Sequence, residues 1–124
     1  MKFSVTIQKI QLGRIGEEAA ADFLKQHGYV IIERNFSNYL GEIDIIATDG
    51  DVLCFVEVKT RNSDRLGSPF EAVPLAKQRK IGRVALSYLQ YKGLSDTKAR
   101  FDVIAVIVNE ECAPSVEIIK NAFE

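Results

Sequence analysis

The seven residues FVEVKTR, from Phe55 to Arg61, combine the alternation of a β-strand with charges on one face. Side chains two apart in a strand share a face, so Glu57 and Lys59 point to the side opposite the intervening valines. An acid and a base in this arrangement occur in catalytic sites and also on ordinary solvated strands. The strand alone does not separate the two interpretations, and its neighbours have to be considered.

A second acidic strand precedes this one, and residues 41–61 read GEIDIIATDGDVLCFVEVKTR. Two β-rich runs joined by an Asp-Gly pair favour a hairpin. A two-residue loop places Glu42 opposite Glu57, whereas a four-residue loop shifted by one places Asp44 opposite Glu57. Both registers put these carboxylates and Lys59 on one face, with Asp44 and Glu57 as direct or diagonal neighbours.

Two carboxylates on adjacent strands repel each other and need compensation. A divalent cation supplies it, since Mg²⁺ prefers one or two carboxylates together with water and phosphate. The ammonium of Lys59 is a compact point charge that can hold a phosphate or polarise a water. A plain salt-bridge cluster of Asp44, Glu57 and Lys59 is the alternative, but interacting charges concentrate at functional sites, which favours catalysis.

A further carboxylate lies on a predicted helix. Apolar residues from Leu12 onward recur at helical spacing, and they predict a helix over about 13–27 after a loosely held arm at 1–12. Glu17 falls at the edge of the apolar stripe and can lean over the sheet. The alternative is an exposed acid in the first helical turn, where the helix dipole favours a negative charge.

The remaining patterns complete an α/β domain. They predict strands near 29–36, 100–108 and 115–119, a polar loop at 62–73, and a helix from Pro74 to Gly93. The resulting order αβββαββ predicts a mixed central sheet flanked by helices. With 124 residues, the chain suits a single domain, residues 1–124.

Composition limits the classes of function. The chain lacks the roughly 20 apolar residues of a membrane helix and the apolar core of a secretory signal, so a cytoplasmic protein with no membrane partner is expected. A net charge of −1 gives no support to a general polyanion binder, so binding of nucleic acid must be local. Solvated surface is the alternative for each candidate; the candidates are Lys77, Arg79, Lys80 and Arg83, and also Arg61 with Arg65 just beyond the charged strand.

Taken together, these motifs resemble the YraN family, an uncharacterised group similar to the restriction-endonuclease-like superfamily. The matching stretches span nearly the whole chain in order. They are LGRIGEEAAADFLKQHGY at 12–29, ERNF at 33–36, GEIDIIATDG at 41–50, FVEVKTR at 55–61, AVPLAKQRKIGRVALSYL at 72–89, RFDVIAV at 100–106 and NAF at 121–123.

The resemblance implies a restriction-endonuclease-like core in which Asp44, Glu57 and Lys59 match the D…ExK pattern, with Glu17 in the place of a helical acid. It implies that Asp44, Glu57 and the Val58 carbonyl hold Mg²⁺, with Mn²⁺ as a substitute. In this interpretation Lys59 orients the water that attacks a phosphodiester.

Two further positions bear on the resemblance. Gln78 matches a position where Holliday-junction-resolvase-like proteins often carry a polar active-site residue. Ser37 stands where many relatives are expected to have an arginine. The expected function is a Mg²⁺-dependent endonuclease acting on DNA, with branched or junction structures as candidate substrates and a homodimer left open. The alternatives are a nucleic-acid-binding module that cuts weakly or needs a partner, and an interaction or scaffold domain.

Overall fold

The computed structural model describes residues 5–62, 73–109 and 112–123, which form two helices and five strands in the order αβββαββ. The elements are α1 (Val5–Gln26), β1 (Val30–Asn38), β2 (Gly41–Asp49), β3 (Val52–Asn62), α2 (Leu75–Tyr91), β4 (Ala99–Asn109) and β5 (Cys112–Phe123). The strands form one sheet in the sequential order β1-β2-β3-β4-β5. Only the β3–β4 pair of this sheet is parallel. The prediction of a mixed α/β domain is confirmed.

The bounds of the terminal elements differ from those predicted. Helix α1 begins at Val5, so residues 5–12 are helical and the expected arm is wrong for them. Residues 5–12 contain no proline or glycine that would end a helix. Gly13 lies inside the helix and lowers helix stability by only about 1 kcal/mol relative to alanine, so the helix continues through it. Strand β5 is longer than the predicted 115–119. Most of the predicted loop at 62–73 lies outside the described residues.

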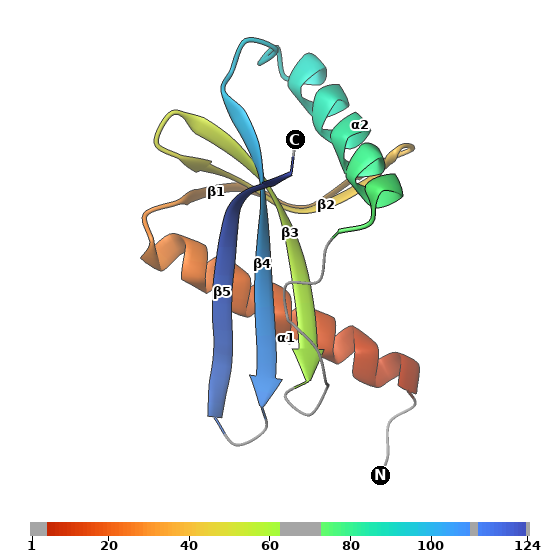
Figure 1. Cartoon of the computed structure of the whole chain (residues 1–124), viewed down its shortest axis with the longest axis vertical. Helices are drawn as coiled ribbons and strands as arrows, with labels where there is room; N and C mark the ends of the chain where they lie inside the picture. The colour runs from red at the N-terminus through yellow and green to blue at the C-terminus, as the bar shows by residue number, and fades with distance from the viewer. Residues whose placement is uncertain (1–4, 63–72, 110–111, 124) are drawn as a thin grey trace.

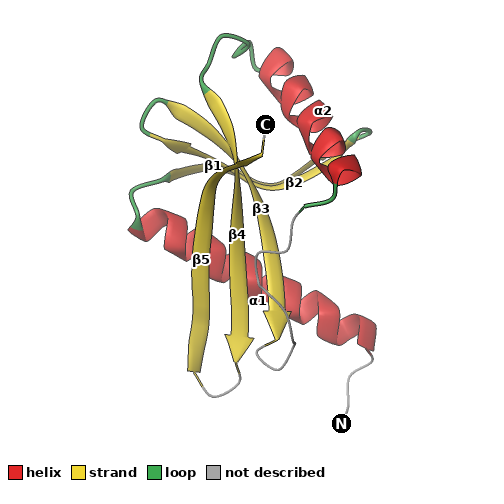
Figure 2. Cartoon of the chain, in the orientation of Figure 1, coloured by secondary structure: helices red, strands yellow, loops and turns green. Residues whose placement is uncertain are grey.

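The sheet has an apolar layer on each face, because side chains of β2 and β3 alternate between the faces. On one face Leu24 of α1 belongs to the same buried cluster as Val56. On the other face Tyr88 of α2 packs edge-on to Phe55, with ring centroids 5.9 Å apart. Figure 1 shows α1 crossing behind β3, β4 and β5 while α2 lies beside the β2 end. Figure 2 shows how strongly the sheet twists between these two regions.

Helix α1 approaches the sheet closely at one glycine. A Cβ built on Gly16 would meet Oγ1 of Thr60 at 1.8 Å, so only glycine lets the helix lie this close to β3. The contact fixes the neighbouring Glu17 near the end of β3. Neither helix of the described part of the chain is long and apolar enough to cross a membrane.

A polar network joins the strand ends away from the β2–β3 carboxylates. Asp102 is fully buried and accepts hydrogen bonds from Nε of Arg100 at 3.0 and 3.2 Å and from the Asn121 N–H at 2.9 Å. Arg100 Nη2 also donates to Tyr29 and to Asp49, both at 2.8 Å. The network holds β2, β4, β5 and the start of β1 together.

Candidate functional site

The β2–β3 hairpin brings two of the predicted site residues together. Backbone pairing of Ile45 with Val56 makes the next position on each strand Asp44 opposite Glu57. Of the two predicted registers, the one that pairs these carboxylates is therefore confirmed. It is reached through a two-residue turn rather than the four-residue loop expected, and Gly50 takes the positive φ that the first turn residue requires.

The backbone pairing of β2 with β3 ends at Ile45 and Val56, and beyond it the Asp44 carboxylate replaces the β2 backbone as a hydrogen-bond acceptor for β3. Its Oδ2 accepts a hydrogen bond from the Val58 N–H at 2.8 Å. The N–H and C=O of one strand residue face the same neighbouring strand. The Val58 carbonyl therefore lies on the side of β3 that faces Asp44, close to Glu57 in the chain.

The electrostatic environment of Asp44 opposes its ionisation. Burial is the largest cause, followed by the negative charge of Glu57, and together they raise the pKa of Asp44 from 3.8 to about 7. The hydrogen bond from Val58 and the positive charge of Lys77 act in the opposite direction, whereas the charge of Glu17 raises the pKa further. The structure thus brings the helical acid within electrostatic range of the pair.

Lys77 of α2 forms an ion pair with Oε1 of Glu57. Burial by itself would lower the pKa of Lys77, but the hydrogen bond to Glu57 and the charges of Glu57, Asp44 and Glu42 raise it. The sequence placed Lys77 only in a nucleic-acid-binding strip, so this contact was missed. A signal existed, because Lys77 lies four residues before buried Ile81 and shares its helix face.

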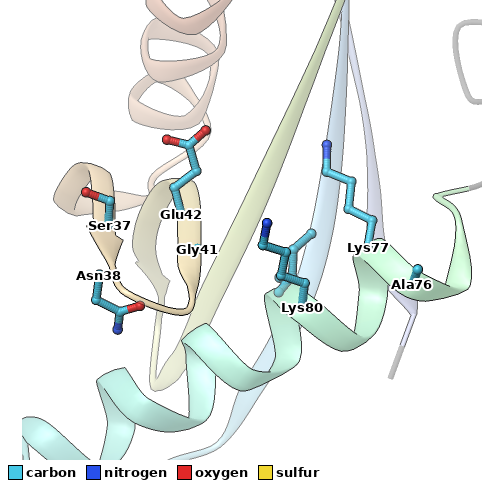
Figure 3. Close-up of a pocket in the computed structure, with 8 residues that line it drawn as sticks. Ser37, Asn38, Gly41, Glu42, Ala76, Lys77 and Lys80 are labelled. Carbon is cyan, nitrogen blue, oxygen red and sulfur yellow. The ribbon is translucent and has the colours of Figure 1, made fainter.

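A groove of about 600 Å³ adjoins the carboxylates, between the β1–β2 turn and α2. Its lining consists of Ser37, Asn38, Gly41, Glu42, Ala76, Lys77, Lys80 and Ile81. Figure 3 shows Glu42 on one wall and the two lysines on the other, with side chains that extend in the same direction. Gly41 has φ +149°, and a Cβ there would lie 3.0 Å from Cε of Lys80. The positive φ favours glycine at this position, whereas the flexible end of the Lys80 side chain could move away from a Cβ.

The predicted basic residues are divided between surfaces. Lys77 and Lys80 line the groove, whereas Arg79 and Arg83 are exposed on α2 and lie outside that lining. Arg61 is half-buried on β3, where it shares the face of Glu57 in the strand alternation and is engaged in an interaction. The structure therefore separates the candidates into a groove pair, an exposed pair and a residue of the sheet.

The two other predicted catalytic residues differ in their surroundings. Lys59 is half-buried, takes part in an interaction, and follows Glu57 by two residues on the same face of β3. The side-chain amide of Gln78 donates to the Val73 carbonyl at 2.8 Å. This contact ties Gln78 to the backbone that precedes α2, a structural role that the sequence did not indicate.

The donor set fits a hard divalent cation by its chemistry. Among residues 5–62, 73–109 and 112–123, no group of three or more His, Cys, Asp or Glu side chains is arranged to hold a metal ion. Asp44, Glu57 and the Val58 carbonyl offer two carboxylates and one carbonyl, all hard oxygen donors. Mg²⁺ is commonly held by one or two carboxylates, with water and substrate phosphate at its other positions.

Comparison with known proteins gives a family but no activity. A family model described as "Uncharacterised protein family UPF0102" matches residues 16–106. A "UPF0102 protein" of Syntrophus aciditrophicus is 48% identical over 124 residues, covering 100% of this chain and 96% of the relative. One from Clostridium tetani is 48% identical over 115 residues, with 92% and 94% covered. One from Geobacter sulfurreducens is 50% identical over 113 residues, with 91% and 88% covered.

Proposed function

Because this chain belongs to the uncharacterised protein family UPF0102, whose name assigns no activity, we propose its function from the site. The proposal is a Mg²⁺-dependent endonuclease with a restriction-endonuclease-like core that hydrolyses DNA phosphodiester bonds. The observation that carries it is the pair Asp44 and Glu57 on adjacent strands, with the Val58 N–H fixed on Asp44. Buried like charges are costly unless a cation compensates them, and the raised pKa of Asp44 indicates that Lys77 does so only in part.

Different residues of the chain have different roles in the proposed reaction. Asp44, Glu57 and the Val58 carbonyl hold the cation, which when bound supplies Lewis-acid charge and a water of lowered pKa. The hydrogen bond from Val58 fixes Oδ2 of Asp44, so its carboxylate is oriented before the cation binds. Lys59 orients the attacking water and stabilises negative charge that develops on the phosphate. Lys80 holds a neighbouring phosphate in the groove.

One observation favours a second candidate function, a nucleic-acid-binding module that cuts weakly or needs a partner. Glu57 is already paired with Lys77, so an ammonium occupies part of the carboxylate that the cation needs. In such a module the groove and the exposed arginines bind the nucleic acid. Cleavage then requires that the ion pair between Lys77 and Glu57 is first broken. The arrangement of these residues is compatible with an endonuclease and with a binding module, so a cleavage measurement is needed to distinguish them.

The deciding experiment is a panel of labelled duplex, nicked, branched and single-stranded DNA with Mg²⁺ or Mn²⁺. We expect wild type to cut at least one substrate, and Asp44→Ala to lose both cleavage and Mn²⁺ binding in a calorimetric titration. Glu42→Gln is the matched control, because it removes an acid of the groove that is outside the donor set. Binding without cleavage supports the module, and equal Mn²⁺ binding in wild type and Asp44→Ala rejects the metal site.

A further inference from the structure

The ion pair between Lys77 and Glu57 links the groove to the carboxylate pair. Only 10% of the Glu57 side chain is exposed, whereas 50% of the Lys77 side chain is. Lys77 is also part of the groove lining, so one residue contacts both parts of the site. No other groove residue among those described is shown in contact with either carboxylate.

We propose that Lys77 is a positioning residue that exchanges between two anions, the carboxylate of Glu57 and a phosphate of the nucleic acid. A divalent cation that binds Glu57 displaces Lys77, and the freed ammonium becomes a phosphate contact in the groove. The inference builds on the proposed function, because it needs both the metal site and a polyanionic substrate. It assigns to Lys77 a coupling between cation binding and substrate binding.

Competition at Glu57 follows from charge and space. The ammonium of Lys77 is bound to Oε1, one of the two oxygens that a cation on Glu57 would use. Cations at neighbouring positions on one carboxylate repel each other, and little solvent reaches this carboxylate to screen the repulsion. Binding of a divalent cation is therefore expected to weaken the ion pair.

The groove offers the displaced side chain a second partner. Lys77 and Lys80 are three residues apart on α2, so they are neighbours on the helix surface. Figure 3 shows both side chains extending in the same direction from the helix. Lysine has a flexible four-carbon stem, which lets its ammonium move without a change in the helix. A phosphate in the groove can then be held by the two ammonium groups together.

Calorimetric titration with Mn²⁺ tests the competition. We expect Lys77→Met to bind Mn²⁺ about fivefold more tightly than wild type, because the ion pair no longer has to be broken. Lys80→Met is the matched control, since it removes the same charge from the same groove without touching Glu57, and should change the affinity by less than about twofold. Lys77→Arg keeps the competing charge and should resemble wild type. Equal effects of the Lys77→Met and Lys80→Met variants would overturn the inference.

The salt dependence of DNA binding tests the second partner. A phosphate contact adds nearly one unit to the slope of log affinity against log salt. With Ca²⁺ present, the slope of Lys77→Met should be smaller than that of wild type by about one unit; with EDTA, the two slopes should agree. The Lys80→Met slope should be reduced equally in both conditions. A Lys77→Met slope reduced equally with EDTA and with Ca²⁺ would mean that Lys77 contacts phosphate regardless of the cation.

The two proposals fail in distinguishable ways. If neither wild type nor any variant binds Mn²⁺, the metal site and the exchange are both rejected. If wild type binds Mn²⁺ and Asp44→Ala does not, but Lys77→Met matches wild type, only the exchange is rejected. Thermal unfolding with EDTA checks that each variant is folded before its affinities are compared.

Discussion

Replacing Asp44 with asparagine should stabilise the protein above pH 7 when divalent cations are removed. The pKa of Asp44 is raised from 3.8 to about 7 by burial and by the charge of Glu57. An acid whose pKa is higher in the folded state binds more protons when folded, so the free energy of unfolding falls as pH rises through this window. Asparagine is never ionised, and its oxygen can still accept the hydrogen bond from Val58.

The magnitude follows from the gap between the two pKa values. The gap is about three pKa units, and about 1.4 kcal/mol per unit gives on the order of 4 kcal/mol for ionising Asp44 in the fold. Above pH 7 the Asp44→Asn variant avoids this cost. Near pH 4 the aspartate is protonated in the folded state and about half protonated in the unfolded chain, so the two proteins should have nearly equal stability.

Urea unfolding with EDTA at four pH values between 4 and 8.5 measures the difference directly. Asp51→Asn is the matched control, because Asp51 lies in the turn of the same hairpin and its side chain is 77% exposed. Its effect should stay below about 1 kcal/mol at every pH. The reasoning about Asp44 is refuted if Asp44→Asn is no more stable than wild type at pH 8.5, or if the difference does not change with pH.

Three further predictions concern catalysis, binding and the fold. Lys59→Met should keep its fold to within about 1 kcal/mol and still bind Mn²⁺ and DNA, yet lose about 100-fold in single-turnover cleavage; wild-type cleavage would exclude Lys59 as a catalytic residue. Removing the charges of Lys77, Arg79, Lys80 and Arg83 together should lower DNA affinity and the slope of log affinity against log salt. Unchanged values would show that these residues do not bind DNA. Asp102→Ala should lower the free energy of unfolding by about 3 kcal/mol in urea, because Arg100 loses a buried partner; a loss below about 1 kcal/mol would contradict this.

Local patterns were sufficient to predict the class of fold and the shared face of the carboxylates. Hydrophobic periodicity indicated both helices, and the Asp-Gly turn indicated the hairpin. The loop length of this hairpin, and with it the register of the two strands, could not be predicted, because both candidate registers keep Asp44 and Glu57 on one face. The ladder contact of Ile45 with Val56 decides between them in the folded protein.

Contacts between distant segments could not be predicted in the same way. The distance from Lys77 to Glu57 depends on how α2 packs against the sheet, where Tyr88 meets Phe55. Periodicity identifies the buried face of a helix but not its position along the strands it covers. Asp102 likewise has one partner on its own strand, Arg100, and one on β5, Asn121. The R-x-D spacing at residues 100–102 is consistent with the first contact but does not indicate the second.

The charges around the proposed site connect metal binding to substrate binding. Among the described residues, four acids and four bases belong to this region; they are Glu17, Glu42, Asp44 and Glu57, against Lys59, Arg61, Lys77 and Lys80. When all are ionised, their charges sum to zero and give no net attraction for a polyanion, and a single divalent cation changes the sum to +2. The whole chain carries −1, so its overall charge adds no attraction for a polyanion. In the proposed function, a cation at Asp44 and Glu57 is therefore expected to strengthen DNA binding in the groove as well as to support cleavage.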